Sequence, residues 1–560
     1  MPPPDCDVAV IGSGLAGSAL ACCLARAGLA VEVFEAGEHP RFAIGESMIL
    51  ETSETLRAMA RLYDVPELAW LTAEPYLGRL GSSHGVKRHF GFLHHGADGA
   101  HDPADRHQSL QAVIPDELHG HELHLFRQDA DAMLAAAAVR YGARLHQRTP
   151  VAGVDLDGDG ATLHTPLGAV RARYVVDAGG RRSPLAEAMG LRTTDGAETH
   201  SRALFTHMVG VRSVHDAPGA ARRDYDVPFT WDEGTLHHVF PGGWTWVIPF
   251  GNHGGSTNPL TSVGLVLDPA VHPAAEGLSP GEEFRAFVAR YPAVAAQFEG
   301  ALAVRPWTRA PRVQHGSREV AGRRWCLLGH AAGFVDPLFS KGLYASTAAA
   351  SLVAHRLILA HETGDWDGVD AGGAVGRQAR GFLRSNDRLV ARSFRAFETA
   401  ELWAAFSVVW LLGAHLELLA LFAARAEATG ADGRIDRGAY FERTASLRMV
   451  GGGFGGFDRL EAEAYAVLDG LGTAAERAAR LRSLLAGPEW VPHEFRSVLA
   501  GGNHLARRKV SLAVLRQPGG PLGRGPYRRH FFGVRSGLRV AGFLAREWAT
   551  YRRPALGTLP

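Results

Sequence analysis

The sequence predicts an α/β (α+β) fold, in which a helix-covered N-terminal sheet carries an inserted antiparallel sheet and precedes a mainly helical portion. Three observations predict this: a strand, a glycine-rich turn and a helix open the chain, residues 200–270 alternate like antiparallel strands, and strands are scarce beyond residue 365. With 560 residues, the chain exceeds what one hydrophobic core normally organises. We expect a module over 1–365, with the antiparallel sheet mainly in 80–105 and 195–320, and a helical domain over 366–560.

The turn that opens the chain has the spacing of a dinucleotide-binding loop. Its glycines stand at the three GxGxxG positions, Gly12, Gly14 and Gly17, after a strand and at the start of a helix. Gly12 permits the tight turn, Gly14 lets backbone approach a pyrophosphate, and Gly17 lets helix and strand pack closely. The next strand ends at Glu35, where a carboxylate accepts hydrogen bonds from ribose hydroxyls. The unit predicts a Rossmann-like sheet with a bound dinucleotide, because a bare glycine-rich turn would not explain Glu35.

A second glycine-rich run, residues 451–456, also fits GxGxxG. No strand–turn–helix unit surrounds it, and residues 474–478, where an acidic strand end should lie, have a helical pattern. We interpret the run as a flexible loop. The chain is therefore predicted to hold one dinucleotide.

Composition excludes several classes of function. The formal net charge of +1 gives no indication of binding to nucleic acid or to an anionic membrane. Four cysteines without CxxC spacing predict buried thiols in a reducing compartment, and no HxxxH or HExxH pair predicts a metal site. The N-terminus lacks the basic and apolar regions of a signal peptide, so we expect a cytoplasmic protein. The most apolar run, 402–414, is too short to span a bilayer and predicts a core helix.

Two later segments are expected beside the same ligand as the N-terminal unit. One is Asp177–Arg181 at the end of a strand, and the other is Gly329–Pro337 after a further buried strand. Together the three segments resemble the FAD-dependent monooxygenase superfamily over roughly residues 5–360. The resemblance implies bound FAD. The usual Gly-Asp of the third segment is here Gly329–His330, which leaves Asp336 as the nearby carboxylate.

The resemblance also implies which residues contact FAD. Glu46 and Ser47 stand where the family has a Gly-Glu-Ser loop against the flavin. Arg127 matches a family arginine near FAD, although a charge flanking the helix that follows would also explain it. The implied FAD-binding residues are Gly12, Gly14, Gly17, Glu35, Glu46, Ser47, Arg127, Asp177, Gly180, Asp336 and Pro337.

The run Trp244–Pro249 carries a narrower resemblance. It fits the WxWxIP pattern of flavin-dependent halogenases at all four defined positions, Trp244, Trp246, Ile248 and Pro249. Bulky rings on one strand face beside the flavin would keep an organic substrate away and admit only a small halide. The alternative is that the two tryptophans simply fill a core.

Lys87 is the second residue that carries the halogenase resemblance. The family places a lysine five positions before a strand phenylalanine, and here Lys87 precedes Phe92 by five. The resemblance implies that its ammonium hydrogen-bonds HOCl or is converted to a haloamine, which holds the halogen beside the substrate. Arginine is less suited to this role, and the chain has lysine only at positions 87, 341 and 509. An exposed strand lysine is the alternative.

A third segment resembles the halide site of these enzymes. It implies that Ser340 and the backbone N–H groups of Lys341 and Gly342, at a helix start, bind chloride or bromide. We expect the side chain of Lys341 to lie on the surface. Tryptophan-specific halogenases have a glutamate just before this serine, whereas this chain has Phe339. A phenol or enol can activate itself by ionising, so phenolic or polyketide-type substrates are favoured over indoles.

The prediction is an FADH2-dependent halogenase of the phenol or aromatic-polyketide type. It chlorinates an electron-rich aromatic, such as a tetracycline-like polyketide, with HOCl relayed by Lys87, and a separate flavin reductase supplies FADH2. An aromatic hydroxylase on the same fold is the first alternative, and a non-catalytic flavin- or ligand-binding protein is the second. His237 and His238 point to opposite faces of their strand, so at most one lines the site. The sequence predicts no oligomeric state.

Overall fold

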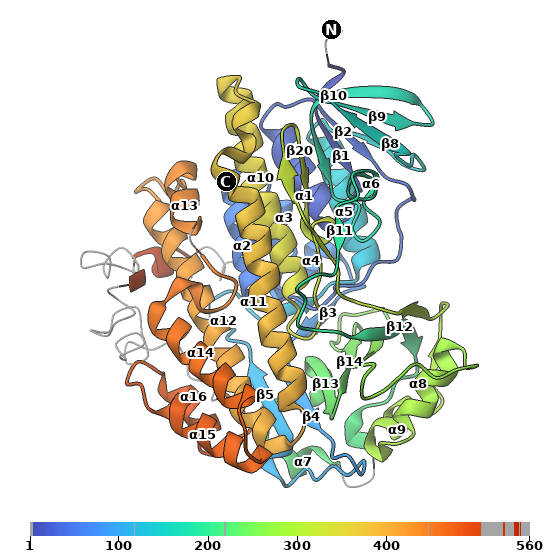
Figure 1. The fold of residues 1–560 in the computed structure, drawn as a ribbon, viewed down its shortest axis with the longest axis vertical. Coiled ribbons are helices and arrows are strands. Elements are labelled where there is room, and N and C mark those ends of the chain that lie inside the picture. Colours follow the sequence, from blue (N-terminus) through green and yellow to red (C-terminus); the bar gives the residue numbers. More distant parts are fainter. Residues whose placement is uncertain are drawn as a thin grey trace.

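The computed structural model describes residues 4–116, 118–217, 220–445, 447–505, 530–531, 542–547 and 549. Lys509 and much of the end of the predicted helical domain lie outside this part of the chain. Two sheets stand at opposite ends of the molecule, and the long helices α10 (Lys341–Thr363), α11 (Ala374–Ala396) and α12 (Ala400–Ala428) run beside them (Figure 1).

The predicted Rossmann-like sheet is present. Its strands follow the order β19-β20-β10-β1-β2-β7, with β1, β2, β7, β10 and β20 parallel, which places sequence-distant strand ends side by side. These strands are β1 (Cys6–Ile11), β2 (Val31–Phe34), β7 (Arg144–His146), β10 (Gly168–Asp177), β19 (Ala321–Gly322) and β20 (Trp325–Leu327). The helices α1 (Leu15–Arg26), α5 (Arg127–Arg140) and α10 pack together in its core. A hairpin of β8 (Gly153–Leu156) and β9 (Ala161–Thr165) extends β10.

The predicted antiparallel sheet is also present, and we call it the substrate sheet. Its main order is β16-β12-β15-β14-β13-β4-β5, antiparallel throughout except where β13 pairs with β4. These strands are β4 (His89–His94), β5 (Ser109–Val113), β12 (Arg202–Val209), β13 (Thr235–Phe240), β14 (Gly243–Pro249), β15 (Thr261–Leu267) and β16 (Leu302–Ala303). One face packs on α8 (Pro280–Val288) and α9 (Pro292–Phe298), and the other packs on the C-terminal helices. Both faces are therefore covered.

Residues 85–94, inside the range 80–105 predicted for the antiparallel sheet, form two strands that belong to different sheets. β3 (Gly85–Lys87) pairs with β6 (Glu122–His124) in a small separate sheet, and β4 joins the substrate sheet. The chain changes partners at Arg88, whose N–H donates to Glu233 and whose carbonyl accepts from Ile114. Lys87 therefore ends the small sheet at the edge of the large one.

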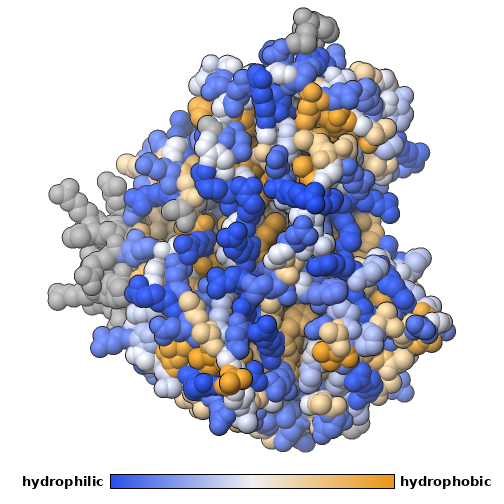
Figure 2. All heavy atoms as spheres, in the orientation of Figure 1, coloured by the Kyte–Doolittle hydropathy of each residue, from blue (hydrophilic) through white to orange (hydrophobic). Residues whose placement is uncertain are grey.

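The C-terminal portion is helical where it is described. After α12 come α13 (Arg437–Thr444), α14 (Gly455–Asp469), α15 (Ala474–Ala486) and α16 (His493–Leu499). The predicted core helix 402–414 lies within α12, which is buried over most of its length. By length and composition α10 and α12 could each cross a membrane, but 72% of the most apolar window of each is buried inside the fold. On the face in Figure 2, hydrophilic residues predominate, with apolar side chains interspersed.

The second glycine-rich run is not a flexible loop. Gly451–Gly453 form a 3-10 turn packed on α12, and α14 begins at Gly455. A Cβ on Gly452 would lie 2.7 Å from the carbonyl oxygen of Leu416, so glycine is needed for close helix packing. Among the described residues, helices rather than a strand precede the run, so it lacks the strand–turn–helix unit of a dinucleotide site.

Candidate active site

The glycine loop between β1 and α1 has the shape needed for a dinucleotide. Gly12 has φ 93°, and a Cβ there would lie 2.7 Å from the carbonyl oxygen of Ala178. A Cβ on Gly17 would lie 2.1 Å from the carbonyl oxygen of Gly12. Gly14 precedes α1 without a side-chain cap, and the first turn of α1 carries no acidic residue. The N-terminal N–H groups of α1 are thus left for an anion such as a pyrophosphate.

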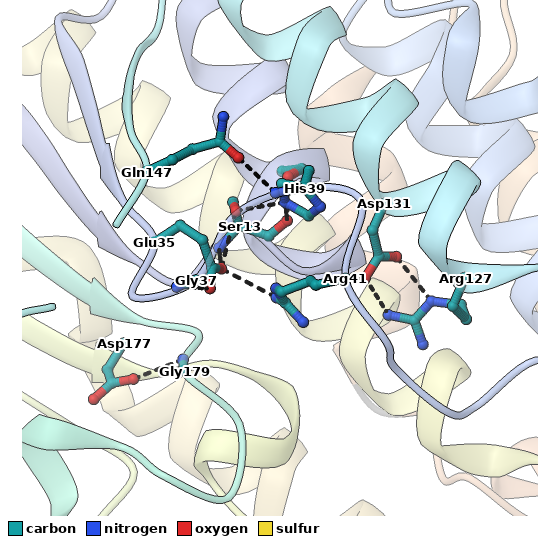
Figure 3. Close-up of polar contacts among 11 residues, drawn as sticks. Ser13, Glu35, Gly37, His39, Arg41, Arg127, Asp131, Gln147, Asp177 and Gly179 are labelled. Atoms are coloured by element: carbon teal, nitrogen blue, oxygen red, sulfur yellow. Dashed lines mark hydrogen bonds and ion pairs between the residues drawn. The ribbon is translucent and has the colours of Figure 1, made fainter. Parts of the chain in front are cut away.

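Glu35 closes the glycine loop at the end of β2. Its Oε2 accepts hydrogen bonds from the N–H and Oγ–H of Ser13, each 3.0 Å away, and pairs with Arg41 at 3.1 Å (Figure 3). Its Oε1 accepts from the N–H of Gly37. Burial raises the pKa of Glu35, but Arg41 and these hydrogen bonds more than offset it, so the pKa lies below its usual range. Glu35 is therefore held ionised beside the loop, where a ribose would lie.

Replacing Glu35 tests its role in binding FAD. We expect Glu35→Gln to raise the Kd for FAD about tenfold, because an amide accepts a ribose hydroxyl less strongly than a carboxylate and leaves Arg41 unpaired. Quenching of FAD fluorescence on titration measures this. The matched control is Glu38→Gln in the same loop, because Glu38 is exposed and should leave the Kd unchanged. Equal affinities for all three proteins would remove Glu35 from the site.

The three segments that resemble FAD-binding motifs meet at the strand ends. The N–H of Ala178 donates to Ile11 at the end of β1, and the N–H of Leu328 donates to Asp177. The carboxylate of Asp177 accepts from Gly179, Ser183 and Leu185, so it holds its own turn in shape. The turn then lies directly against the glycine loop, as the Ala178 contact of Gly12 shows.

Arg127 holds a loop that connects two parts of the site. It binds both carboxylate oxygens of Asp131, at 2.8 and 2.9 Å (Figure 3). It also donates to the carbonyls of Ile44 and Gly45. Residues 44–48, here called the linking loop, run from this contact to Lys87. The implied flavin contact Glu46 lies within this loop, buried and 2.6 Å from His207.

The third segment leads into the start of α10. Asp336 is buried and accepts from the N–H of Leu338 and the Oγ–H of Ser201, both at 3.0 Å, and burial raises its pKa to about 7. Each carboxylate oxygen of Asp336 thus already accepts a hydrogen bond from within the protein. Pro337 accepts from the N–H of Ser340, which has φ 56° and immediately precedes α10. The first N–H groups of α10, from Lys341 and Gly342, have no acceptor within the helix, which suits a halide.

The side chain of Lys341 is buried, contrary to the expectation of a surface lysine. Its Nζ lies 2.6 Å from Glu51 on α2 (Leu50–Leu62) and 2.7 Å from Glu417 on α12. Burial lowers its pKa, but the two carboxylates more than compensate, so the pKa lies above its usual value. The lysine fastens the halide segment to two helices, because a buried ammonium requires such partners.

Lys87 is fully buried, so the exposed-strand alternative is wrong. Its Nζ donates to Ser47 Oγ at 2.7 Å and to the Met48 carbonyl at 2.8 Å, and it lies 3.2 Å from the centroid of the Phe90 ring. Ser47, an implied flavin contact, thus contacts the lysine. Burial lowers the pKa of Lys87 well below its usual value, against the opposing effects of Glu122 and of Glu51. A larger share of neutral amine is therefore available than for a surface lysine.

Aromatic rings join Lys87 to the WxWxIP strand. Phe90 stacks on His237 with centroids 5.9 Å apart, and His237 lies 5.5 Å from Trp244. On the same face, Trp246 lies 5.8 Å from Trp244, and both indoles are buried. His237 is therefore the histidine of its pair that faces this side. His238 points to the other face, where it binds Gln297.

The helix α12 covers this aromatic face. Trp410 packs edge-on against Phe90 and stacks on Phe339, and Trp403 packs on Phe92. Phe339, at the position where tryptophan-specific halogenases have a glutamate, is buried among these rings. The face is enclosed by apolar rings and contains one buried primary amine among the described residues, a setting in which a reactive halogen can be held away from water.

The residues around the glycine loop fit FAD, and sequence reasoning found only part of the site. It missed Ser13 and Arg41, which bind Glu35, and Asp131, which binds Arg127. It also missed Thr235, which hydrogen-bonds Ser47, and His124, which hydrogen-bonds Thr235. The serine inside GxGxxG was visible as a candidate. The other contacts depend on segments that meet only in the fold.

Several known proteins are similar to this chain. A family model described as an FAD binding domain matches residues 5–221. Tetracycline 7-halogenase from Kitasatospora aureofaciens is 43% identical over 410 residues, 72% of each chain. Monodechloroaminopyrrolnitrin halogenase PrnC from Pseudomonas fluorescens is 42% identical over 423 residues, 75% of this chain and 73% of that one. The crystal structure of halogenase PltM with phloroglucinol and FAD superposes with a TM-score of 0.83 at 31% identity, over 89% of this chain and 99% of that one.

Proposed function

Since this chain belongs to the flavin-dependent halogenases, we propose that it chlorinates an electron-rich phenolic or polyketide aromatic through a halogen carried by Lys87. The burial and hydrogen bonding of the Lys87 amine on the aromatic face is the observation that carries the proposal. Bound FAD, once reduced, supplies with dioxygen the oxidising power that turns chloride into HOCl. The remaining steps fall to side chains of this protein.

The halide site is proposed at the start of α10. The N–H groups of Lys341 and Gly342, with Ser340 before them, would bind chloride beside FAD. The buried ion pairs of Lys341 support this, because they fix the position of the segment. Trp244 and Trp246, with Ile248 and Pro249, would form the wall that keeps the organic substrate from the flavin.

Lys87 would carry the halogen from that wall to the substrate. As a neutral amine, Nζ forms an N–Cl bond while the Cl–O bond of HOCl breaks, and hydroxide leaves with one Nζ proton as water. The N–Cl bond then breaks as the C–Cl bond forms, and the ring proton passes to Nζ. A charged Lys87 would instead hold HOCl by a hydrogen bond. Either course keeps the halogen beside the aromatic face.

The substrate class is proposed from Phe339 and from the relatives. Phe339 offers no carboxylate, so the substrate must be activated by its own ionisable hydroxyl. A phenol meets this need, and the named relatives include a tetracycline halogenase and a protein crystallised with phloroglucinol. We further propose a separate flavin reductase as partner, because the described residues form one dinucleotide-binding unit. The four free, buried cysteines support a reducing, cytoplasmic setting.

Product mass tests this function against a hydroxylase. With reduced FAD from an added reductase, a panel of phenols and polyketides should gain the mass of chlorine or bromine in place of hydrogen, according to the halide supplied. Omission of halide should leave the substrate unchanged. A gain of one oxygen that ignores the halide would instead identify a hydroxylase, and no product with any candidate would favour a ligand-binding protein.

A further inference from the structure

Lys87 stands at one end of a buried chain of hydrogen bonds that the proposed reaction does not explain. Ser47 Oγ, which accepts from Lys87, lies 2.8 Å from Thr235 Oγ1. Thr235 Oγ1 lies 2.9 Å from Nε2 of His124, and Nδ1 of His124 lies 2.8 Å from the carbonyl oxygen of Pro249. All the side chains that form this series of hydrogen bonds are buried. The chain thus connects the lysine to the last residue of the WxWxIP strand.

The Pro249 carbonyl, at the end of the series opposite Lys87, determines which group donates in each hydrogen bond. The Pro249 carbonyl can only accept, so Nδ1 of His124 carries a proton. Burial lowers the pKa of His124 to about 3, so its ring is neutral and Nε2 can only accept. Thr235 must then donate to Nε2, and Ser47 must donate to Thr235. The oxygen of Ser47 therefore presents only lone pairs to Lys87.

This direction determines how Nζ of Lys87 is oriented. Ser47 and the Met48 carbonyl are both acceptors, so each takes one hydrogen from Nζ. A neutral amine has two hydrogens, and both are used. Its lone pair is then left without a hydrogen-bond partner among the described residues. In the charged form, the Phe90 ring is the remaining partner for the third hydrogen.

We propose that Thr235 and His124 are positioning residues for halogen transfer, which fix the Ser47 hydroxyl as an acceptor and so keep the lone pair of Lys87 free of hydrogen bonds. The inference rests on the proposed function and adds two residues to it. Without the Thr235 hydroxyl, Ser47 could turn its hydrogen onto Nζ and cover that lone pair. The amine would remain in place but would be a poorer halogen acceptor.

Several other titratable groups face Lys87 and are common to all the variants below. Glu122 is its cross-strand partner on β6, and Glu51 lies on α2. His89 and His237 face it from β4 and β13, and burial lowers the pKa of each, to about 4 and about 3. These rings are neutral at neutral pH and add no charge beside the amine.

The test compares three threonine variants in the FAD-bound protein. Thr235→Val removes the hydroxyl and keeps the shape, and Thr235→Ser keeps the hydroxyl. Thr245→Val is the matched control, because Thr245 is buried in the neighbouring strand and its hydroxyl has no hydrogen-bond partner in the part of the chain that the structure describes. We expect halogenated product per reduced FAD to fall at least about tenfold in Thr235→Val. In the same variant, the amount of HOCl that reacts with an added scavenger should rise as the halogenated product falls. Thr235→Ser and Thr245→Val should give the same amounts of product and free HOCl as the unmodified protein.

A second measurement reports on the amine without turnover. Only three lysines occur in the chain, so protein labelled with [15Nζ]lysine gives three side-chain signals, and Lys87→Met identifies one of them. The titration midpoint of Lys87 should fall in Thr235→Val, because a Ser47 hydrogen on the lone pair favours the neutral amine. Thr235→Ser should restore it.

Three results would overturn the inference. They are an unchanged product-to-HOCl ratio in Thr235→Val, an unchanged Lys87 midpoint, or an equal loss in Thr245→Val. Halogenation by the unmodified protein distinguishes failure of this inference from failure of the proposed function. If the unmodified protein halogenates no candidate, the function is wrong, whereas normal halogenation by Thr235→Val removes only the positioning role.

Discussion

Lys87→Met should reduce halogenated product by at least about 100-fold while reduced FAD is still consumed at its normal rate. Methionine fills a similar volume but offers neither an amine nor a hydrogen-bond donor to HOCl. The dinucleotide loop, the Trp244 wall and the start of α10 are separate from the removed group, so HOCl should still form. It should then appear in solution, where an added scavenger records it.

Two controls show whether the loss in Lys87→Met comes from the missing amine or from a general loss of structure. Lys87→Arg keeps a buried charge but has no neutral amine, because guanidinium stays protonated, so it should also fail to halogenate. FAD affinity and the thermal midpoint should stay near those of the unmodified protein, which excludes a general collapse. Halogenation by Lys87→Met within a few-fold of normal would mean that the amine carries no halogen.

Lys341→Met should destabilise the protein by about 3–5 kcal/mol, because it leaves two carboxylates buried without their ammonium partner. The side chains of Lys341, Glu51 and Glu417 are all nearly inaccessible to solvent. Removing one partner of a buried ion pair costs far more than removing one at the surface. Chemical denaturation measures the decrease in the free energy of unfolding, from the shift in the midpoint of the transition in which α10 unfolds.

The loss in Lys341→Met should depend on pH. Burial raises the pKa of Glu417 to about 8, against the opposing effect of Lys341. A carboxyl whose folded pKa is raised favours the folded state most below its unfolded pKa, near 4.5, and that advantage is lost as pH rises through about 8. The deficit should therefore be smaller at about pH 6, where Glu417 can protonate, than at about pH 9.

Two further variants isolate the buried charge. Adding Glu417→Gln to Lys341→Met removes one unpaired carboxylate and should recover part of the loss. Arg437→Met is the surface control, since its partner Glu362 is half exposed, and it should cost no more than about 1 kcal/mol. A deficit in Lys341→Met that matched this control would show that the buried pairs contribute little.

Much of the fold could be predicted because its signals are local. The glycine loop and the position of Glu35 each depend on residues close in sequence, and both stand where expected. The run near Lys87 was harder, because the split at Arg88 comes from backbone partners at Glu233 and Ile114.

The site was predictable as a set of motifs but not as a set of contacts. Lys341 was expected at the surface because its partners, Glu51 and Glu417, lie 290 and 76 residues away. The role of Ser47 was likewise hidden, since its partner Thr235 is 188 residues distant. No periodicity or spacing reveals such pairs. The scarcity of lysine was informative, because the chain has only three lysines and one of them is Lys87.

The central claim is that halogen reaches the substrate only through Lys87, and competition with an external scavenger tests it most directly. The unmodified protein is given substrate, halide and reduced FAD, with and without a large excess of a soluble HOCl scavenger. If the halogen stays bound, substrate halogenation should be the same in both reactions. If the scavenger suppresses product in proportion to its concentration, HOCl travels through solvent and the buried amine is not its carrier.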